Sequence, residues 1–344
     1  MSTRTPDLVV AGGGPVGLAA ALYAARAGLR VVVREPRTGA LDKACGEGLM
    51  PAAVARLADL GVHPQGSALA GIRYLDGGHG VEARFRHGAG RGVRRTTLHE
   101  ALRAAVEDAG IPVQHRAVRQ VASGRDWVLV DDQPARFLLA ADGLHSPVRR
   151  MLGLEAPVRV RRRYGLRCHW RRAPWTDLVE VHWSRHAEAY VTPVADDLVG
   201  VAVLSSRRVP LAEALADFPD LGVRLRGLEP GRVRGSGPLR QRSTTRVRGR
   251  VLLVGDAAGY VDALTGEGIA AGLAQAEAAV AAIAADRPGD YEAAWRRLTR
   301  RHDLLTHGLL GATRLPVVRR AIVPAAARLP WVFETAVDQL ARPA

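Results

Sequence analysis

The feature that most constrains this chain is a glycine-rich run near its beginning, which reads Gly-Gly-Gly-Pro-Val-Gly over residues 12–17. A short apolar stretch precedes it, as in a buried parallel strand, and an alanine-rich stretch that predicts a helix follows it. In such a strand–turn–helix, Gly12 permits a tight turn, Gly14 lets the backbone approach a pyrophosphate, and Gly17 lets the helix pack closely on the strand. The helix N-terminus then presents free N–H groups to the phosphates. We therefore expect a dinucleotide-binding βαβ unit.

A second apolar stretch, residues 29–33, predicts the next strand of this unit and leads to Glu35. The Glu35 carboxylate follows the glycines by about 20 residues, where an acceptor for a ribose hydroxyl is needed. The glycines and Glu35 together indicate a dinucleotide site, but they do not distinguish FAD from NAD.

The basic composition of the chain raises the question of a nucleic-acid partner, because the formal net charge is +15 over 344 residues. Lys43 is the one lysine, however, and the arginines are scattered, with short runs at 94–95, 149–150 and 161–163. Aromatic residues make up 5%, which is too sparse for a platform on which bases stack. We attribute the charge to arginine usage and to phosphate-bearing cofactors, and we expect no nucleic-acid partner.

The remaining broad features favour a cytoplasmic protein. No apolar stretch approaches the roughly 20 residues of a membrane-spanning helix, and a strand at residues 7–11 leaves no room for a signal peptide. Cys45 and Cys168 are the two cysteines, so a disulfide framework is excluded and a reducing compartment is expected. The eleven histidines show no metal spacing, so we expect no metal site and interpret isolated histidines such as His169 as structural. Peripheral membrane contact and the oligomeric state stay open.

Two later segments bear on the identity of the cofactor. Residues 139–149, Leu-Ala-Ala-Asp-Gly-Leu-His-Ser-Pro-Val-Arg, and residues 251–258, Val-Leu-Leu-Val-Gly-Asp-Ala-Ala, resemble the flavin motifs of the aromatic-hydroxylase-like flavoproteins. This resemblance implies that the cofactor is FAD, that Asp142 belongs to its site and that Asp256 bonds its ribityl chain. It also implies that Arg95 contacts the flavin, with a surface arginine as the less favoured alternative.

The helix that starts near Gly268 completes the flavin site that the resemblance implies. Its N-terminus would face the pyrimidine ring, where a reduced flavin carries negative charge that a helix N-terminus stabilises. The expected cofactor-binding residues are Gly12, Gly14, Pro15, Val16, Gly17, Glu35, Arg95, Asp142, Asp256, Gly266, Gly268 and Ile269.

A narrower resemblance links the chain to the geranylgeranyl reductase family. Residues 43–51, Lys-Ala-Cys-Gly-Glu-Gly-Leu-Met-Pro, resemble its lysine–cysteine–glycine segment, and residues 262–269 resemble its Asn-Pro-…-Gly-Gly-Ile segment, with Asp-Ala in place of Asn-Pro. Residues 189–193 fall where that family carries Tyr-x-Trp-x-Phe-Pro, of which Tyr190 and Pro193 survive. The resemblance implies that these two residues contact substrate.

Cys45 has two interpretations, which the sequence leaves open. In the first, it lies beside the flavin and donates a proton to the substrate, with Lys43 lowering its pKa. In the second, it is a small packing residue in a glycine-rich loop. The candidate catalytic residues are therefore Cys45 and Lys43.

The pattern of elements predicts an α/β fold in which a Rossmann-like FAD-binding domain, of the glutathione-reductase type and hydroxylase-like, is interleaved with an antiparallel-sheet substrate domain. Residues 71–86 read as a hairpin, a capping box at Thr97 as a helix start, and 159–204 as further strands. Helices broken at Pro316, Pro324 and Pro330 end the chain. The expected division is 1–70, 93–155 and 246–286 for FAD binding, 71–92 and 156–245 for substrate, and 287–344 for C-terminal helices.

Two enzymatic functions compete for this chain. One is reduction of a carbon–carbon double bond in a small hydrophobic molecule, as the geranylgeranyl reductase resemblance implies, and the other is hydroxylation or epoxidation by an FAD-dependent monooxygenase. Both need NADH or NADPH as the electron donor, and no second dinucleotide fingerprint is visible. The chain lacks the Trp-x-Trp-x-Ile-Pro segment of flavin halogenases, which disfavours halogenation. A flavin-binding protein without turnover is the third hypothesis, and nothing in the sequence favours it.

Overall fold

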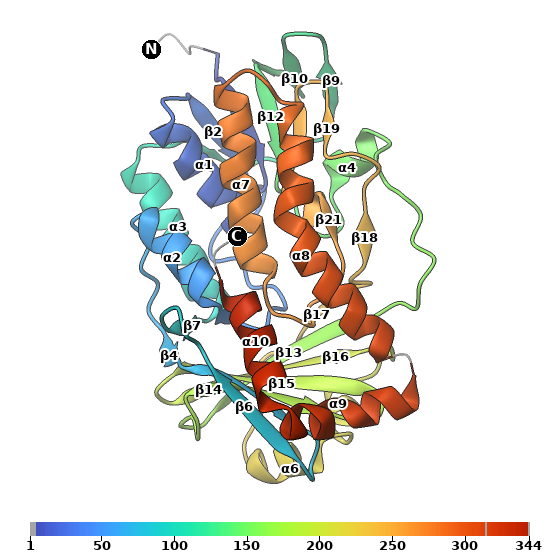
Figure 1. Ribbon diagram of the computed structural model, residues 1–344. Coiled ribbons are helices and arrows are strands. Elements are labelled where there is room, and N and C mark those ends of the chain that lie inside the picture. Colours follow the sequence, from blue (N-terminus) through green and yellow to red (C-terminus); the bar gives the residue numbers. More distant parts are fainter. Residues whose placement is uncertain (1–4, 314, 343–344) are drawn as a thin grey trace.

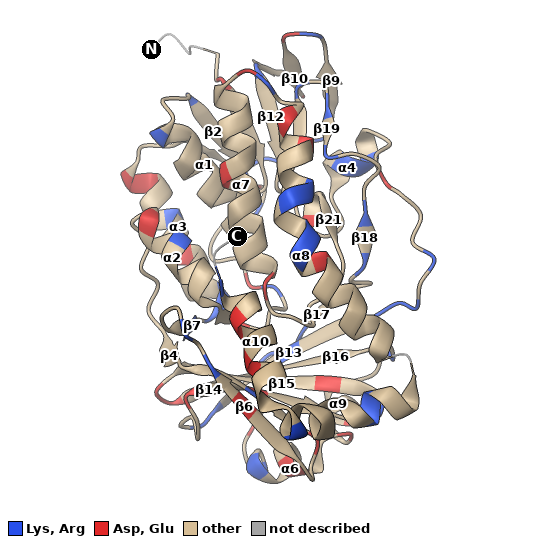
Figure 2. Ribbon diagram, in the orientation of Figure 1, with Lys and Arg blue, Asp and Glu red and all other residues tan. Residues whose placement is uncertain are grey.

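The computed structural model describes residues 5–313 and 315–342, and it consists of two large β-sheets placed end to end with helices packed along them (Figure 1). Basic and acidic residues are distributed over both ends rather than gathered at one (Figure 2). Among the described residues, no helix is both long enough and apolar enough to cross a membrane.

The first sheet has six strands, and the glycine-rich turn follows its central strand. Its order is β19-β20-β12-β1-β2-β8, with every neighbouring pair parallel except β19 and β20. The strands are β1 (Leu8–Ala11), β2 (Val31–Arg34), β8 (Val113–Gln114), β12 (Phe137–Ala140), β19 (Val247–Arg248) and β20 (Val251–Leu253).

Both faces of this sheet are covered, which explains why its strands are apolar throughout. Leu8 and Val10 pack against helices, whereas Val9 and Ala11 pack against a three-stranded meander, because successive strand residues point to opposite faces. The helices are α1 (Pro15–Arg26), α2 (Pro51–Asp59), α3 (Arg95–Asp108) and α7 (Gly268–Ala284), and the meander is β9 (Val121–Ser123), β10 (Val128–Val130) and β11 (Gln133–Ala135).

The second sheet has seven strands in the order β17-β13-β16-β15-β14-β5-β6. Its pairs are antiparallel except that β5 runs parallel to β14, so the expected hairpin joins the sheet edge through a parallel pair. The strands are β5 (Gly71–Leu75), β6 (Gly80–Arg84), β13 (Tyr164–Arg171), β14 (Leu178–Trp183), β15 (Ala187–Ala195), β16 (Leu198–Ser205) and β17 (Arg234–Ser236). The predicted α/β fold class with a Rossmann-like sheet and an interleaved, mainly antiparallel sheet is confirmed.

The remaining elements before the last three helices are short. They are β3 (Gly48–Leu49), β4 (Ser67–Leu69), β7 (Gly90–Gly92), α4 (Pro147–Met151), α5 (Leu211–Leu215), α6 (Pro219–Arg224), β18 (Gln241–Arg242), the 3₁₀ turn η1 (Gly255–Ala257) and β21 (Gly259–Tyr260).

The chain ends in three helices, α8 (Asp290–Ala312), α9 (Pro316–Arg328) and α10 (Pro330–Ala341). Pro316 and Pro330 are the first residues of their helices, where a missing N–H costs nothing. The break expected at Pro324 is wrong, because α9 continues through it. The helix loses one hydrogen bond there, and Val323 holds the segment by packing into the core of the second sheet.

The capping box at Thr97 is also wrong. Helix α3 begins two residues earlier, at Arg95, and its N-cap residue Arg94 makes no side-chain cap. Instead the Arg95 N–H donates to the Glu47 Oε1, at 2.8 Å, from a distant loop. A carboxylate from outside the helix therefore fulfils the capping role that the local pattern assigned to Thr97.

We predict that Gly17→Ala strongly destabilises the protein. A β-carbon on Gly17 would overlap the carbonyl oxygen of Gly12, a backbone atom that has no room to move. The expected loss in the free energy of unfolding is about 1–3 kcal/mol or more, as for other overpacked sites, and the midpoint of urea unfolding measures it.

The matched control is Gly308→Ala in α8, where a β-carbon meets nothing within 4 Å. Since alanine is the better helix former by roughly 0.5–1 kcal/mol, this variant should unfold at the same or a higher urea concentration. Equal midpoints for the two variants would contradict the packing role of Gly17.

Candidate functional site

The glycine turn leaves an open cradle between β1 and α1. Gly12 has a φ of +103°, and a β-carbon there would lie 2.5 Å from the Ala141 carbonyl oxygen. At Gly14, which caps α1, the single neighbour of a β-carbon would be the Arg95 Nη2 at 3.9 Å. The N–H groups of the first turn of α1 thus face space that a phosphate fits.

Glu35 is buried at the end of β2, beside this turn. Its Oε2 accepts the Gly13 N–H at 2.9 Å, and Arg37 donates to both of its oxygens at 2.7 and 3.0 Å. Burial alone would raise the pKa of Glu35, but the hydrogen bonds from Arg37 and Gly13 outweigh it, and the pKa is lowered. The carboxylate is therefore ionised and is held against the glycine turn.

The opposite wall of the cradle is η1 and the first turn of α7. Gly255 has a φ of +59° and donates its N–H to the Gln275 Oε1 at 2.8 Å, which ties η1 to α7. The Val16 side chain packs against Gly272, where a β-carbon would lie 2.5 Å from its Cγ2. Val16 therefore joins α1 to α7, which leaves its backbone N–H at the helix N-terminus for a cofactor.

The loop before α7 bends at Gly266, which has a φ of +71°, and the helix begins at Gly268 without a side-chain cap. Ile269 packs on the core between the first sheet and its helices. The uncapped N–H groups of this first turn are available to a ligand.

Charged groups around the cradle have buried atoms without partners. Asp142 accepts the Val148 N–H at 3.0 Å through Oδ2, but its Oδ1 and the Nε of Arg95 are buried and bond nothing in the described structure. Desolvation raises the pKa of Asp142 and of Asp256 and lowers that of Arg95. Such orphaned groups around open backbone N–H groups fit a large polar cofactor such as FAD.

Lys43 and Cys45 lie on the loop that borders this cradle. The Lys43 Nζ approaches within 3.3 Å of the position of a β-carbon on Gly143. Desolvation and the positive charges of Arg37 and Arg95 lower the pKa of Lys43. The ammonium therefore lies beside the Asp142–Gly143 turn.

The expectation that Lys43 lowers the pKa of Cys45 is wrong. Desolvation raises the pKa of this half-buried thiol, and the opposing charge is that of Arg95 rather than Lys43. The Glu47 N–H donates to its Sγ at 3.4 Å. Cys45 is consequently a protonated thiol at neutral pH, which is the state that a proton donor needs and a nucleophile does not.

Glu47 is the site residue that sequence reasoning missed. It is buried with a φ of +60°, its Oε1 accepts the Arg95 N–H, and its Oε2 lies 2.6 Å from the His169 Nε2. Arg167 lies 3.7 Å from the same carboxylate and also pairs with Asp42. His169 is therefore paired rather than isolated, and the signal available was the glutamate between two glycines after Cys45.

Tyr190 and Pro193 lie in β15, at the junction of the second sheet with the cradle. The Tyr190 hydroxyl donates to the Leu264 carbonyl at 2.8 Å, and its ring belongs to an apolar cluster with Met50. Pro193 is buried, and its carbonyl lies against Gly92 of β7. Tyr190 thus reaches the loop that precedes α7, whereas Pro193 holds two strands together.

Asp262, which stands where the geranylgeranyl reductase motif has asparagine, lies in a buried ion-pair network. Its Oδ2 is 3.0 Å from the Arg163 Nε, and Arg163 also bonds Glu188 at 2.6 Å. Burial and the charge of Glu188 raise the pKa of Asp262 to about 6, against the effect of Arg163. Asp262 therefore ties the loop before α7 to β13 and β15.

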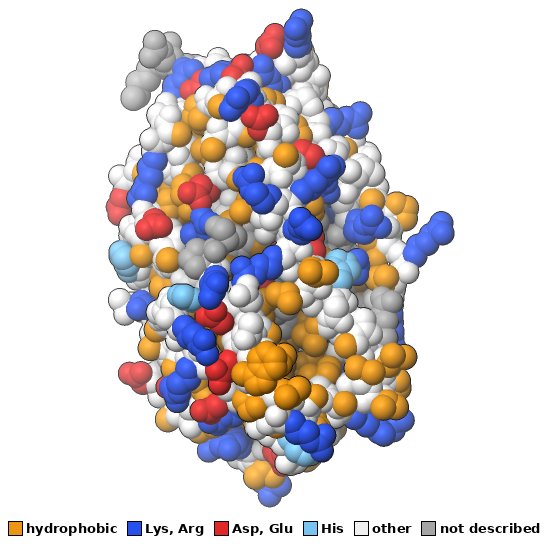
Figure 3. Space-filling view, in the orientation of Figure 1, with side chains coloured by type: hydrophobic (Ala, Val, Ile, Leu, Met, Phe, Trp, Pro, Cys, Tyr) orange, Lys and Arg blue, Asp and Glu red, His pale blue; other side chains and the backbone are white. Residues whose placement is uncertain are grey.

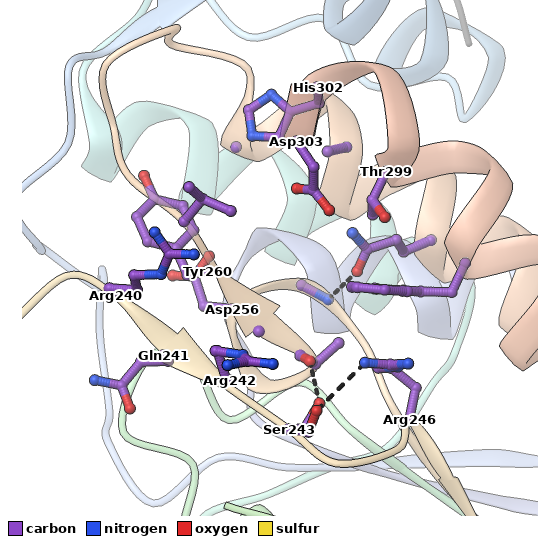
Figure 4. Close-up of a pocket in the computed structure, with 18 of the residues that line it drawn as sticks. Arg240, Gln241, Arg242, Ser243, Arg246, Asp256, Tyr260, Thr299, His302 and Asp303 are labelled. Atoms are coloured by element: carbon purple, nitrogen blue, oxygen red, sulfur yellow. Dashed lines mark hydrogen bonds between the residues drawn. The ribbon is translucent and has the colours of Figure 1, made fainter. Parts of the chain in front are cut away.

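A cavity of about 450 Å³ adjoins the cradle, between β18, β21, η1, α7 and α8 (Figure 4). It shares Asp256 and Gly268 with the cradle but none of the glycine turn. Its basic lining residues are Arg240, Arg242, Arg246, His302 and His307.

The arginines of this cavity differ in their partners. Arg246 pairs with Glu292 and lies 4.0 Å over the Trp295 ring, and Arg240 bonds His307. The exposed Arg242 side chain makes no ion pair among the described residues. It is the cationic group of this cavity that is available to an incoming anion.

Comparisons with known proteins show which proteins this chain is similar to. Residues 5–205 match the family described as FAD binding domain. The chain is 34% identical over 307 residues to a menaquinone reductase of Mycobacterium tuberculosis, covering 78% of this chain and 74% of that protein. It is 28% identical over 324 residues to digeranylgeranylglycerophospholipid reductase 2 of Methanosphaera stadtmanae, covering 83% and 79%.

Among solved structures, a flavin-dependent halogenase superimposes with a TM-score of 0.79 at 20% identity, covering 98% of this chain and 72% of that one. At this identity the likeness concerns the fold. Together with the match over residues 5–205, these relatives show that the chain belongs to the FAD binding domain family and is a flavin-dependent oxidoreductase related to menaquinone reductase.

Proposed function

We propose that this protein uses FAD and a nicotinamide donor to reduce a carbon–carbon double bond in a hydrophobic, isoprenoid-like molecule. The observation that carries the proposal is Cys45, a protonated thiol beside the cradle in the segment 43–51 that resembles the geranylgeranyl reductases. When bound, reduced FAD supplies a hydride to one carbon of the double bond, and the second carbon needs a proton. The Cys45 Sγ is the group that we assign to deliver that proton.

The chain's own residues position and hold the reacting groups. Glu47 fixes the loop that carries Cys45, because its backbone N–H bonds the thiol sulfur and its carboxylate is tied to α3 and β13. Arg95 places a positive charge near the thiol, which stabilises the thiolate left after proton transfer. Thr192 donates from β15 to the Gly46 carbonyl at 2.8 Å and anchors the other side of the loop.

The apolar wall of the site supports a hydrophobic substrate. Met50, Tyr190 and Leu264 belong to one apolar cluster that reaches the loop before α7. The names of the curated relatives, which act on menaquinone and on digeranylgeranylglycerophospholipid, agree with an isoprenoid substrate. Tyr190 is assigned to this wall through its ring, with its hydroxyl directed to the Leu264 carbonyl.

The function is tested by anaerobic mixing of the reduced flavoprotein with a geranylgeranyl compound or a menaquinone. A reductase reoxidises its flavin without oxygen and yields a product two mass units heavier in its isoprenoid chain. A monooxygenase, the alternative function, shows no anaerobic reoxidation and forms a transient hydroperoxide absorbance when oxygen is added. The second result would replace the reductase proposal.

The cavity beside Asp256 supports the use of a nicotinamide donor. Its lining carries three arginines as well as Asp256 and Asp303, and it adjoins the cradle through Asp256 and Gly268. Arg242, which makes no ion pair among the described residues, matches a phosphate of NADH or NADPH. Arginine is well suited to phosphate because its guanidinium donates in a fixed fork. A donor that binds here needs no second Rossmann domain.

Arg242→Gln is expected to raise the dissociation constant of NADH or NADPH about tenfold, the lower end of the effect of losing one charged hydrogen bond. FAD content should stay unchanged, and rapid-mixing measurement of flavin reduction against donor concentration gives the constant. The matched control is Arg171→Gln, whose parent side chain is 87% exposed on β13. If the dissociation constant of NADH or NADPH changes equally in both variants, the cavity is not the binding site of the donor.

Glu35→Ala is expected to weaken FAD binding by about ten- to a hundredfold, because losing a charged acceptor costs about 1.5–3 kcal/mol. Fluorescence titration of the apoprotein with FAD measures the change. Glu35→Gln keeps an acceptor for the Gly13 N–H and should fall between the parent and the alanine variant.

Glu107→Ala is the matched control for Glu35, because that glutamate is exposed at the far end of α3. Its FAD dissociation constant should equal that of the parent. If Glu35→Ala binds FAD as tightly as this control does, the ribose role of Glu35 is wrong.

Cys45→Ser is expected to slow flavin reoxidation by the organic substrate about 10²–10⁴-fold, the usual contribution of general acid catalysis. Flavin reduction by the nicotinamide donor should stay nearly unchanged, because that step does not use the thiol. Serine preserves the volume but is a far poorer acid. Rapid mixing of the two half-reactions, the second without oxygen, separates these effects.

Cys168→Ser is the matched control, because that thiol is buried in β13 and donates to the Gly231 carbonyl at 3.0 Å, a bond that serine retains. Both half-reactions should be unaffected in this variant. A packing role for Cys45 predicts the same small effect in both serine variants, and that outcome would remove the proton donor from the proposal.

A further inference from the structure

Exposed apolar side chains concentrate on the last three helices of the chain. Seven of the thirteen exposed large hydrophobic residues among the described residues fall between positions 304 and 332. They are Leu304, Leu315, Val317, Val318, Leu329, Trp331 and Val332, which we call the C-terminal apolar face. A monomer surrounded by water seldom exposes so large a group in one place.

The residues of the C-terminal apolar face lie together in space. Figure 3 shows hydrophobic side chains gathered where Figure 1 places α9, α10 and the end of α8. A hollow of about 370 Å³ between α8 and α10 is lined by apolar groups of Leu304, Leu305, Trp331, Val332 and Ala336. The face therefore combines protruding apolar groups with an apolar groove.

Helix α9 of this face carries charge of one sign, and the nearby Glu334 of α10 pairs with Arg86. The sequence carries no aspartate or glutamate between Asp303 and Glu334, although it carries arginines there. Arg320 and Arg328 of α9 are exposed, and neither makes an ion pair among the described residues. An apolar surface with a cationic border complements a surface of acyl chains covered by anionic headgroups.

We propose that the C-terminal apolar face docks on an anionic lipid membrane. Helices α9 and α10 have 13 and 12 residues, too short to cross a bilayer, so they lie in the interface with Trp331 at the level of the headgroups. Trp331 is 66% exposed and Val317 is 80% exposed, so neither is used by the protein's own core.

The apolar cluster behind this face leads towards the flavin cradle. Val323, Phe333 and Val337 of α9 and α10 belong to the same cluster as Met50 and Tyr190. A lipid chain that leaves the bilayer at the groove would have to displace these packed apolar side chains to reach the loop before α7. Docking itself does not depend on the proposed reaction, whereas this route for a substrate rests on it.

The test is co-sedimentation of the purified FAD-loaded protein with vesicles of equal parts phosphatidylglycerol and phosphatidylcholine, and with vesicles of phosphatidylcholine alone. The parent should bind the anionic vesicles and release them as salt is raised. The double variant Val317→Ser/Trp331→Ser should lose at least about tenfold in partitioning, because its apolar anchors are gone. Arg320→Gln and Arg328→Gln should each lose about fivefold on anionic vesicles alone.

The matched control is Trp127→Ser/Val158→Ser, which removes exposed apolar groups outside the C-terminal apolar face, directly before β10 and in the loop between α4 and β13. It should bind vesicles as the parent does, and both double variants should keep their FAD and their rate of reduction by the donor. Absence of vesicle binding by the parent, or equal losses in both double variants, would overturn the proposal. So would a parent dimer that Val317→Ser/Trp331→Ser converts to monomer, because a second copy would then cover the face.

Discussion

The close contact between α1 and the turn after β1 is the constraint on which the remaining structure depends. Gly17 rests on the Gly12 carbonyl without a β-carbon between them, and Val16 beside it packs against Gly272 of α7. Two helix N-termini are thereby held on either side of one space. Because helix N-termini carry unsatisfied N–H groups, this packing creates an anion-binding cradle before any charged side chain is considered.

Glu47 connects that cradle to the second sheet. The buried Glu47 carboxylate accepts the first N–H of α3 and pairs with His169 of β13. The backbone N–H of Glu47 donates to the Cys45 sulfur. A buried carboxylate of this kind is stable only when its lone pairs are satisfied. Glu47 is therefore one of the residues that couple the two sheets, and the position of the candidate acid depends on it.

Charged side chains are distributed differently at the two ends of the molecule. The cradle sets Lys43 and Arg95 against Asp142 and Asp256, and desolvation shifts the pKa of each towards its neutral form. These four charged groups fit a ligand that brings its own charges and hydrogen bonds. At the far end, by contrast, α9 exposes apolar side chains and carries no carboxylate, and its Arg320 and Arg328 make no ion pair among the described residues. One end of the molecule is thus suited to a dinucleotide and the other to lipid.

The sequence by itself determined the βαβ unit, Glu35 and the order of the flavin motifs, because a glycine turn and a buried parallel strand are local steric requirements. Only the tertiary structure decided the pKa of Cys45, the start of α3 and the pairing of Glu47 with His169, which are 122 residues apart. Those properties arise from burial and from partners brought together by the two sheets. The spacing of residues along the chain does not reveal burial or distant partners. Local patterns therefore predicted a helix cap at Thr97 and an effect of Lys43 on the pKa of Cys45, and both predictions were wrong.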